Sequence, residues 1–227
     1  MKRENLEKSV AKRFELIVFD WDGTLMDSAA AIVASIQASC RDLAIAPPSD
    51  DQARHIIGLG LQDALRGALP ELDPARYHEV AERYRHHYLS RDHELALFEG
   101  AYALVSALGE AGFLLAVATG KSRIGLDRAL NSSGLQPHFH GSRCADECHS
   151  KPHPQMLLEL MEEFDVAPES TLMIGDTTHD LLMARNAHVP ALAVAYGAHP
   201  RATLEIEAPL LCAETVAEMH AWLMTNA

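Results

Sequence analysis

The chain has 227 residues, of which 48% are hydrophobic and 22% are charged. These proportions are typical of a globular protein with a sizeable core, and they exclude disordered, fibrous and collagen-like classes. The formal net charge of −13 disfavours nonspecific binding to nucleic acid or to an anionic membrane surface.

The sequence has four cysteines and no apolar run of the roughly 18 residues that a membrane span needs. The first apolar run is too short for a signal peptide and ends in acidic residues. We therefore expect a cytoplasmic protein without a disulfide framework and without a nucleic-acid or membrane partner. No exposed apolar stripe can be told from the core, so the oligomeric state stays open.

The chain begins with a polar extension over residues 1–13, in which no chemistry is visible. Residues 16–19 (LIVF) form an apolar, partly β-branched run, which is typical of a buried strand. This strand ends abruptly at Asp20.

The pattern changes in residues 28–98. Apolar residues recur at helical spacing over 29–43, 50–69 and 74–90, and prolines at 47, 48 and 70 separate these segments. No convincing strand lies in this stretch, so we interpret it as a helical insertion.

After Gly100 the predicted strands and helices alternate. Strands are predicted at 113–118, 138–141, 171–174, 191–195 and 210–211, and helices at 101–111, 123–133, 155–164, 179–186 and 216–224. Such alternation predicts an α/β fold with a Rossmann-like parallel sheet covered by helices on both faces. The core would comprise residues 14–27 and 99–227, and the insertion would follow the first strand.

Polar residues fall where three of the predicted strands end. Asp20, Thr119 and Asp176 each follow an apolar run. Right-handed crossovers place the carboxyl ends of parallel strands on one edge of the sheet, where open α/β sheets bind ligands. We therefore expect these residues to surround one ligand.

Asp20 and Asp22 are two residues apart, so in an extended segment their side chains point the same way. Two close carboxylates repel, which raises one pKa or recruits a cation. A divalent ion would keep one carboxylate ionised while the other acts as a general acid and base. Capping of a following helix is the alternative interpretation.

Two further segments have the composition of a phosphate site. Thr119 and Gly120 precede a predicted helix, and their hydroxyl and backbone N–H groups suit a phosphate cradle. Lys151 precedes Pro152, which fixes the local backbone, and its ammonium could neutralise phosphate charge. An ordinary capping turn and a surface lysine are the alternatives.

Asp176 and Asp180 are four residues apart at a predicted junction between loop and helix, so they would lie on one side. Carboxylates at a strand end suit Mg²⁺, which prefers a few oxygen ligands together with water and phosphate. Helix capping by Asp176 is again the alternative.

In this order, the four motifs resemble those of the haloacid dehalogenase-like phosphohydrolase superfamily, in its phosphoglycolate phosphatase-like branch. The opening motif, residues 19–28, reads FDWDGTLMDS, and the resemblance extends from Leu16 to the end of the chain. One departure is Trp21, where a smaller apolar residue is commoner. We expect its bulk to reshape the apolar side of the site.

The resemblance implies a role for each motif residue. Asp20 would be the nucleophile that becomes an aspartyl-phosphate, and Asp22 would be the general acid and base. The site residues implied are, for Mg²⁺, Asp20, the backbone carbonyl of Asp22, Asp176 and Asp180, and, for phosphate, Thr119, Gly120 and Lys151. Asp180 would bind the metal directly or lie just outside its ligands, and in either case would also orient Lys151.

In this branch the insertion is called a cap and chooses the substrate. The segment with His55, Gly58 and Leu59, leading to a helix with Arg66, is the candidate for substrate contact. Related sugar-phosphate mutases carry an arginine in this loop, where this chain has Leu61. Arg66 could replace that arginine.

The sequence therefore predicts a Mg²⁺-dependent phosphomonoester hydrolase of a small phosphorylated metabolite, similar to phosphoglycolate phosphatase. The alternatives are a phosphosugar mutase of the β-phosphoglucomutase type and a pyrophosphatase or nucleotidase. A dehalogenase would need neither Asp22 nor Asp176, and a non-catalytic scaffold would be expected to lose these charged residues. The sequence does not name the substrate.

Overall fold

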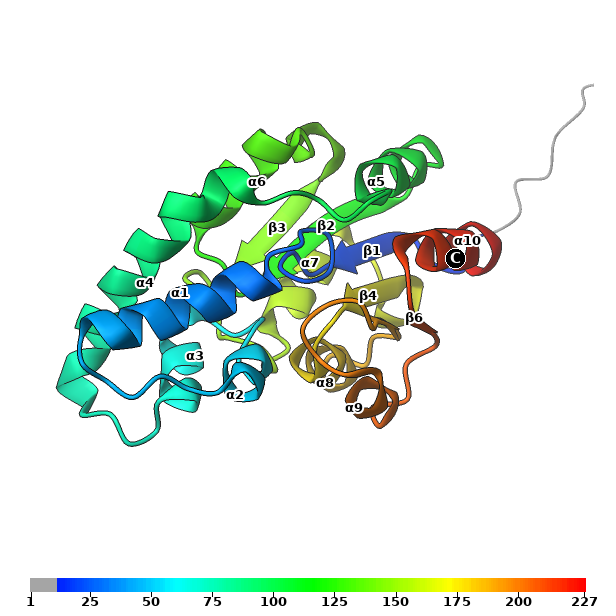
Figure 1. The fold of residues 1–227 in the computed structure, drawn as a ribbon. Helices are drawn as coiled ribbons and strands as arrows, with labels where there is room; N and C mark the ends of the chain where they lie inside the picture. Colours follow the sequence, from blue (N-terminus) through cyan, green and yellow to red (C-terminus); the bar gives the residue numbers. More distant parts are fainter. Residues whose placement is uncertain (1–11) are drawn as a thin grey trace, which may run out of the picture.

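The fold is built on one parallel sheet of six strands in the order β3-β2-β1-β4-β5-β6 (Figure 1). The computed structural model describes residues 12–227, so the predicted extension over 1–13 lies outside the described residues except for its last two. The strands are β1 (Leu16–Phe19), β2 (Leu114–Thr119), β3 (Gly141–Cys144), β4 (Thr171–Gly175), β5 (Ala191–Val194) and β6 (Cys212–Ala213). The predicted α/β fold class is confirmed.

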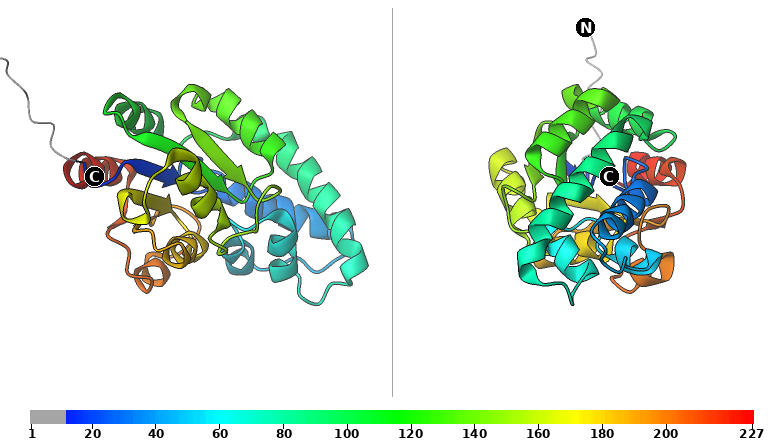
Figure 2. Two further views of the ribbon diagram at one scale, coloured as in Figure 1. Left: turned by 180° about the vertical axis from the view of Figure 1, so that it is seen from behind. Right: turned by 60° about the vertical axis from the view of Figure 1, so that its left-hand side comes forward.

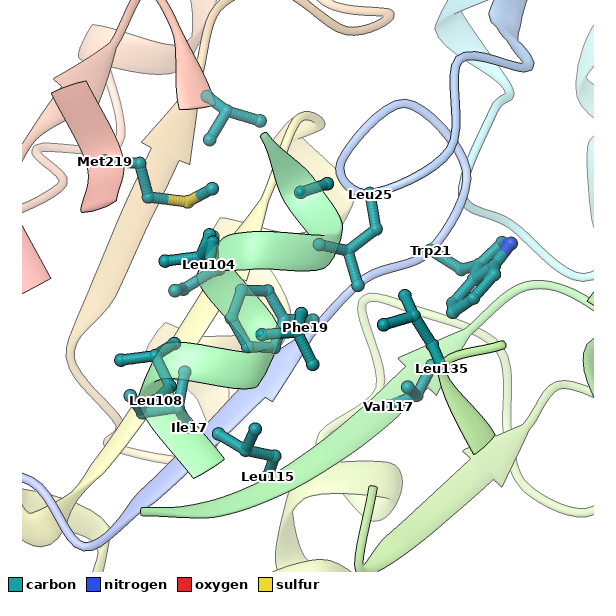
Figure 3. Close-up of a cluster of buried hydrophobic side chains, with 14 of the residues drawn as sticks. Ile17, Phe19, Trp21, Leu25, Leu104, Leu108, Leu115, Val117, Leu135 and Met219 are labelled. Carbon is teal, nitrogen blue, oxygen red and sulfur yellow. The ribbon is translucent and has the colours of Figure 1, made fainter. Parts of the chain in front are cut away.

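Helices cover both faces of this sheet. They are α5 (Ala101–Glu110), α6 (Arg123–Ser133), α7 (Gln155–Phe164), α8 (Thr178–Asn186), α9 (Arg201–Glu205) and α10 (Val216–Asn226). Because side chains alternate along a strand, Ile17 and Phe19 of β1 face a cluster that includes α5 and α10, as Figure 3 shows for Leu104 and Leu108. Leu16 and Val18 face the opposite cluster, which includes α7 and α8.

The helical insertion consists of α1 (Ala29–Asp42), α2 (Asp50–His55), α3 (Leu61–Ala68) and α4 (Tyr77–Arg91). It has its own apolar cluster, which contains Ile36, Leu65 and Val80. Helices α1 and α4 lie side by side in both Figure 1 and Figure 2. The insertion is therefore held by contacts among its own helices.

The chain leaves and re-enters the core through two paired segments. The N–H of Asp27 donates to the carbonyl of Ala96 at 3.0 Å, and the N–H of Phe98 donates to the carbonyl of Leu25 at 3.0 Å. These hydrogen bonds hold both ends of the insertion beside the end of β1.

The helical spacing predicted over 50–69 is interrupted at the loop that contains Gly58 and Gly60, because the structure has two helices there, α2 and α3, separated by residues 56–60. Gly58 has a φ of +91°, a value that side chains disfavour. Gly60 then takes an extended conformation and caps α3. The apolar periodicity continues through this loop, because Ile56 and Ile57 are buried, so the pattern alone does not reveal the break.

Two of the strands form two or three residues later in the chain than predicted. The strand predicted at 138–141 forms over Gly141–Cys144 instead, after the short 3₁₀ helix Gln136–His138. The strand predicted at 210–211 forms over Cys212–Ala213. Both are edge strands, and β3 buries only Cys144, so its sequence lacks the apolar run by which a central strand is recognised.

The helix α9 was not predicted. The remaining elements are the 3₁₀ helices η1 (Pro74–Arg76), η2 (Asp92–Glu94) and η4 (Pro168–Ser170). Within the described residues, no helix combines the length and the apolar composition that crossing a bilayer would require.

Candidate active site

The strands β2, β1 and β4 end at the same edge of the sheet, and the predicted acidic residues follow β1 and β4. In β1, Phe19 pairs with Val117 of β2 and with Ile174 of β4, so the residues that follow reach the same edge of the sheet. The N–H of Asp20 still donates to the carbonyl of Ile174, at 2.8 Å. Asp20 is therefore fixed to the sheet by its backbone and is fully buried.

Lys151 joins two of the carboxylates. Its ammonium lies 2.6 Å from Oδ1 of Asp20 and 2.6 Å from Oδ1 of Asp180, and all three side chains are buried. Burial works to lower the pKa of Lys151, but Asp180 and Asp20 raise it above its ordinary value, so the ammonium stays charged. The interpretation of Lys151 as a surface residue is wrong.

Asp180 is oriented by the start of α8. The side chain of Thr177 caps this helix, and Oδ2 of Asp180 accepts from the N–H of Thr177 at 3.1 Å and from its hydroxyl at 2.7 Å. Both carboxylate oxygens of Asp180 therefore have hydrogen-bond donors, one from Thr177 and one from Lys151. This arrangement fixes the direction from which Lys151 approaches Asp20.

Asp176 follows β4 and is held by hydrogen bonds from other residues than those that hold Asp180. Its Oδ1 accepts from the hydroxyl of Thr24 at 3.0 Å, and its Oδ2 accepts from the N–H of Ala198 at 2.7 Å. Gly23 and Gly197 pack so closely that a Cβ on them would lie 2.1 and 2.3 Å from the Asp176 side chain. Burial, followed by the charge of Asp180, raises the pKa of Asp176 to about 7.

The three carboxylates fit a divalent cation. One oxygen from each of Asp20, Asp176 and Asp180 lies within 4.8 Å of the others. When all three carboxylates are ionised, the Lys151 ammonium neutralises one of them and the cluster keeps two negative charges. Burial raises the pKa of Asp20 well above its ordinary value. Among the described residues, Oδ2 of Asp20 is buried without a hydrogen-bond partner. A buried anionic oxygen without a donor is the type of ligand that Mg²⁺ takes.

Asp22 lies just beyond this cluster, where β1 turns toward the insertion. Its Oδ1 accepts from the hydroxyl of Ser28 at 2.6 Å, and the Lys121 ammonium lies 3.0 Å from the same oxygen. Lys121 also donates to the Tyr88 hydroxyl of α4 at 2.9 Å. Lys121 was not predicted as a site residue, although a lysine directly after Thr119 and Gly120 was a visible signal.

Trp21, between the two aspartates, does not reshape the site as expected. Its side chain is fully buried in the core cluster and packs edge-on against Phe139, with ring centroids 6.5 Å apart. Figure 3 shows it beside Leu135, and it belongs to the same apolar cluster as Phe19. Alternation along the extended chain explains this, since Trp21 points opposite to Asp20 and Asp22.

Thr119 and Gly120 lie beneath the loop between α2 and α3. Thr119 is buried, and its Oγ1 accepts from the N–H of Lys121 at 3.2 Å. A Cβ on Gly120 would lie 2.4 Å from the carbonyl oxygen of Leu59 and 2.6 Å from that of Gly58. The glycine therefore permits the insertion to approach the site closely.

Of the four insertion residues that were predicted to contact substrate, three line one cavity and His55 does not. Gly58, Leu59 and Arg66 line a cavity of about 650 Å³ that Asp22 and Gly120 also line. A second cavity, of about 770 Å³, lies within the insertion and is lined by none of the site carboxylates.

His55 lies outside the lining of the first cavity, where α2 contacts the core. Its backbone carbonyl accepts from Nε2 of His179 at 2.7 Å and from Nε2 of His199 at 3.1 Å. Its ring stacks on that of His199. The carbonyl of His55 and its ring thus join the insertion to the core.

Comparison with known proteins gives consistent matches. Residues 17–194 match the family model described as haloacid dehalogenase-like hydrolase. The chain is 36% identical to "Probable phosphatase IndB" of Dickeya dadantii over 90% of this chain and 91% of that protein. It is 32% identical to a phosphoglycolate phosphatase of Agrobacterium fabrum, over 85% of each chain.

Two further matches are a relative named as a pyrophosphatase and a solved structure. A pyrophosphatase PpaX of Halalkalibacterium halodurans is 32% identical, over 79% of this chain and 83% of that protein. Among solved structures, a hydrolase from Pseudomonas syringae has the same fold, with a TM-score of 0.85 and 22% identity over 93% of this chain and 98% of that one.

Proposed function

The chain belongs to the haloacid dehalogenase-like hydrolase family and, like its named relatives, is a phosphatase; on that premise we propose that it hydrolyses phosphomonoesters of small metabolites through an aspartyl-phosphate on Asp20. The observation that carries this proposal is the setting of Asp20. Its carboxylate is fixed by the backbone of β1, paired with the Lys151 ammonium and left with one buried oxygen without a donor.

The proposed reaction has two displacements at phosphorus. An oxygen of Asp20 bonds to phosphorus, the bond to the substrate oxygen breaks, and Asp22 gives its proton to the departing alcohol. Asp22 then takes a proton from water, whose oxygen attacks phosphorus and releases phosphate and the Asp20 carboxylate. A carboxylate suffices as nucleophile because phosphoryl transfer needs mainly positioning and charge neutralisation.

The phosphate oxygens need donors, and we assign them to Thr119, Gly120 and Lys151. Thr119 ends β2 and Gly120 follows it, at the same edge of the sheet as Asp20, and Lys151 already contacts the Asp20 carboxylate. A buried ammonium held between two carboxylates cannot turn away, so it would stabilise the charge that develops on the phosphoryl group.

We propose that the divalent cation is Mg²⁺, held by Asp20, Asp176 and the backbone carbonyl of Asp22. The unpartnered Oδ2 of Asp20 and the two residual negative charges of the cluster support this assignment. Because one oxygen of Asp180 pairs with the Lys151 ammonium and the other accepts two hydrogen bonds from Thr177, we assign it mainly to positioning Lys151. The ion would supply positive charge to the transferring phosphoryl group.

A sugar-phosphate mutase needs a cation that holds a second phosphate in the cavity. Arg66, the candidate for this role, has 63% of its side chain exposed and lies 3.5 Å from Asp63. This position favours hydrolysis over mutase activity. Phosphoglycolate and pyrophosphate, after which two relatives are named, are the first substrates to assay.

The test is the Asp20→Asn variant, assayed for release of phosphate from p-nitrophenyl phosphate in the presence of Mg²⁺. We expect turnover to fall by at least about 10³-fold, because an amide oxygen is too weak a nucleophile to form the intermediate. EDTA should abolish the activity of the unmodified enzyme, and Mg²⁺ should restore it. Asp27→Asn is the matched control, since Asp27 is exposed and lies in the same motif. Full activity of Asp20→Asn would refute the proposal.

A further inference from the structure

The cavity beside Asp22 lies between the insertion and the core. Its volume is about 650 Å³, within the range of small-molecule sites. Asp22, Gly120 and Lys121 contribute from the core, and α1 and α4 contribute from the insertion. If Asp22 protonates the departing alcohol, this cavity is the space that receives the rest of that alcohol.

One side of the cavity is apolar and aromatic. Ile32 and Ile36 of α1 line it, and so do Tyr84 and Tyr88 of α4, whose rings stack with centroids 5.7 Å apart. A wall of aliphatic side chains and aromatic rings gains free energy by covering an apolar surface of the ligand. It offers few partners to a small, fully hydrated leaving group.

Two exposed apolar side chains also line the cavity, beside exposed charged residues such as Arg128. Ile124, in the first turn of α6, is 73% exposed, and Leu89 of α4 is 45% exposed, and both line the cavity. Large apolar side chains exposed at the mouth of a cavity are typical of a ligand-binding site. A ligand that extends from Asp22 to the mouth would cover them.

Each cation that lines the cavity has a carboxylate neighbour. Among the described residues, the lining cations all pair with carboxylates: Lys121 with Asp22 at 3.0 Å, Arg66 with Asp63 at 3.5 Å, Arg128 with Asp92 at 3.8 Å, and Arg85 with Glu82. A carboxylate or phosphate on the leaving group would have to compete with these carboxylates. The cavity therefore disfavours a leaving group that carries its own negative charge.

From these observations we propose that the substrates are monophosphates of neutral alcohols with an apolar or aromatic body, larger than the two-carbon acid of phosphoglycolate. This inference rests on the proposed phosphatase function and names the substrate class of the same site. Water and the monophosphate ester give inorganic phosphate and the free alcohol, whose ring lies between α1 and α4 until it leaves.

A set of three synthetic monoesters tests the inference: 2-phenylethyl phosphate, ethyl phosphate and phosphoglycolate. All three release primary aliphatic alcohols, so the set isolates the body of the leaving group. Burying about 100 Å² of the phenyl ring should raise kcat/KM for 2-phenylethyl phosphate over that for ethyl phosphate by roughly 50- to 100-fold. Phosphoglycolate should be no better than ethyl phosphate.

Two matched variants locate the effect in the cavity. Ile124→Ser removes an exposed apolar side chain at the mouth, and Ile206→Ser removes an isoleucine that is 77% exposed and does not line the cavity. Ile124→Ser should raise KM for 2-phenylethyl phosphate by about three- to tenfold and leave KM for ethyl phosphate within twofold. Ile206→Ser should change neither. Neither substitution alters a buried position, so both variants should fold.

The outcomes separate this inference from the proposed function. If phosphoglycolate or ethyl phosphate is hydrolysed as well as 2-phenylethyl phosphate, or if both serine variants act alike, the enzyme is a phosphatase but the inference is wrong. If none of the three esters nor p-nitrophenyl phosphate is hydrolysed with Mg²⁺, the proposed function itself fails. Preference for 2-phenylethyl phosphate that Ile124→Ser reduces and Ile206→Ser preserves supports the inference.

Discussion

Lys151 is the residue on which the electrostatics of the site depend. Its ammonium is buried 2.6 Å from carboxylate oxygens of both Asp20 and Asp180, more than 25 residues away in sequence on either side. The sequence indicated an ammonium near an acidic edge, but it did not reveal that the side chain is fully buried. Burial follows from the packing of three strand ends around it, and no local pattern near Lys151 contains that information.

We predict that Lys151→Met destabilises the protein more than a compensated double variant does. Removing the ammonium leaves Asp20 and Asp180 buried without their partner, which should lower the free energy of unfolding by about 3–5 kcal/mol without Mg²⁺. Lys151→Met combined with Asp180→Asn removes one charge of each sign and should recover part of that loss. Urea unfolding of both variants measures the difference. An unchanged midpoint for Lys151→Met would contradict this electrostatic role of the ammonium.

At the scale of the elements, the central strands and long helices were predictable and the edge strands were not. β1, β2 and β4 are apolar runs buried on both faces, so the sequence marks them within one residue. β3 is an edge strand with three half-buried residues, and its sequence contains glycine, serine and arginine. Pairing with β2 makes it a strand, and that pairing is a long-range contact.

Gly109 and Gly120 have different structural roles, and replacing each with alanine distinguishes these roles. Gly109 lies inside α5, where the nearest atom to an added Cβ is 4.0 Å away. Gly109→Ala should raise the free energy of unfolding by about 0.5–1 kcal/mol, because alanine loses less backbone freedom in a helix. Thermal unfolding checks the result.

Gly120→Ala, in contrast, should reduce kcat/KM for p-nitrophenyl phosphate at least tenfold, because its Cβ would displace the loop carbonyls of Gly58 and Leu59. Steady-state kinetics of both alanine variants, with Gly109→Ala expected to behave like the unmodified enzyme, provides the comparison. Equal activity of the two variants would show that the loop need not approach Gly120 so closely.

At the scale of the whole molecule, two apolar cores meet at the active site. The insertion has its own cluster of buried side chains, which also includes Ala198 of the core, and polar groups join the two units as well. The N–H of Gly60 donates to the Ser150 hydroxyl at 2.8 Å, and the carbonyl of His55 accepts from two core histidines. Residues from both units therefore form the cavity next to Asp22.

The acidic cluster links the stability of the whole molecule to pH and to Mg²⁺. The pKa of Asp176 is raised from 3.8 to about 7, so between these values the folded state holds a proton that the unfolded state has lost. Stability of the metal-free protein should therefore decrease as the pH rises through this window. The proposed Mg²⁺ would compete with that proton and would stabilise only the folded state.

We thus predict that 10 mM Mg²⁺ raises Tm more at pH 7.5 than at pH 5.5. Differential scanning calorimetry at the two pH values, with and without EDTA, measures both shifts. Asp176→Asn should show a small Mg²⁺ response at either pH and serves as the control. An equal Mg²⁺ shift at both pH values in the unmodified protein would contradict the link to Asp176.

The alternation of strands and helices, the position of the insertion and the acidic residues that follow β1 and β4 can all be recognised in the amino-acid sequence. These features are local, because a strand end or an amphipathic helix is recorded in adjacent residues. Three features emerge only when the chain is folded: Lys151 is buried against Asp20, Lys121 pairs with Asp22, and His55 lies outside the cavity. Each of these depends on contacts between residues far apart in the chain, and side-chain burial is set by the neighbours that folding brings together.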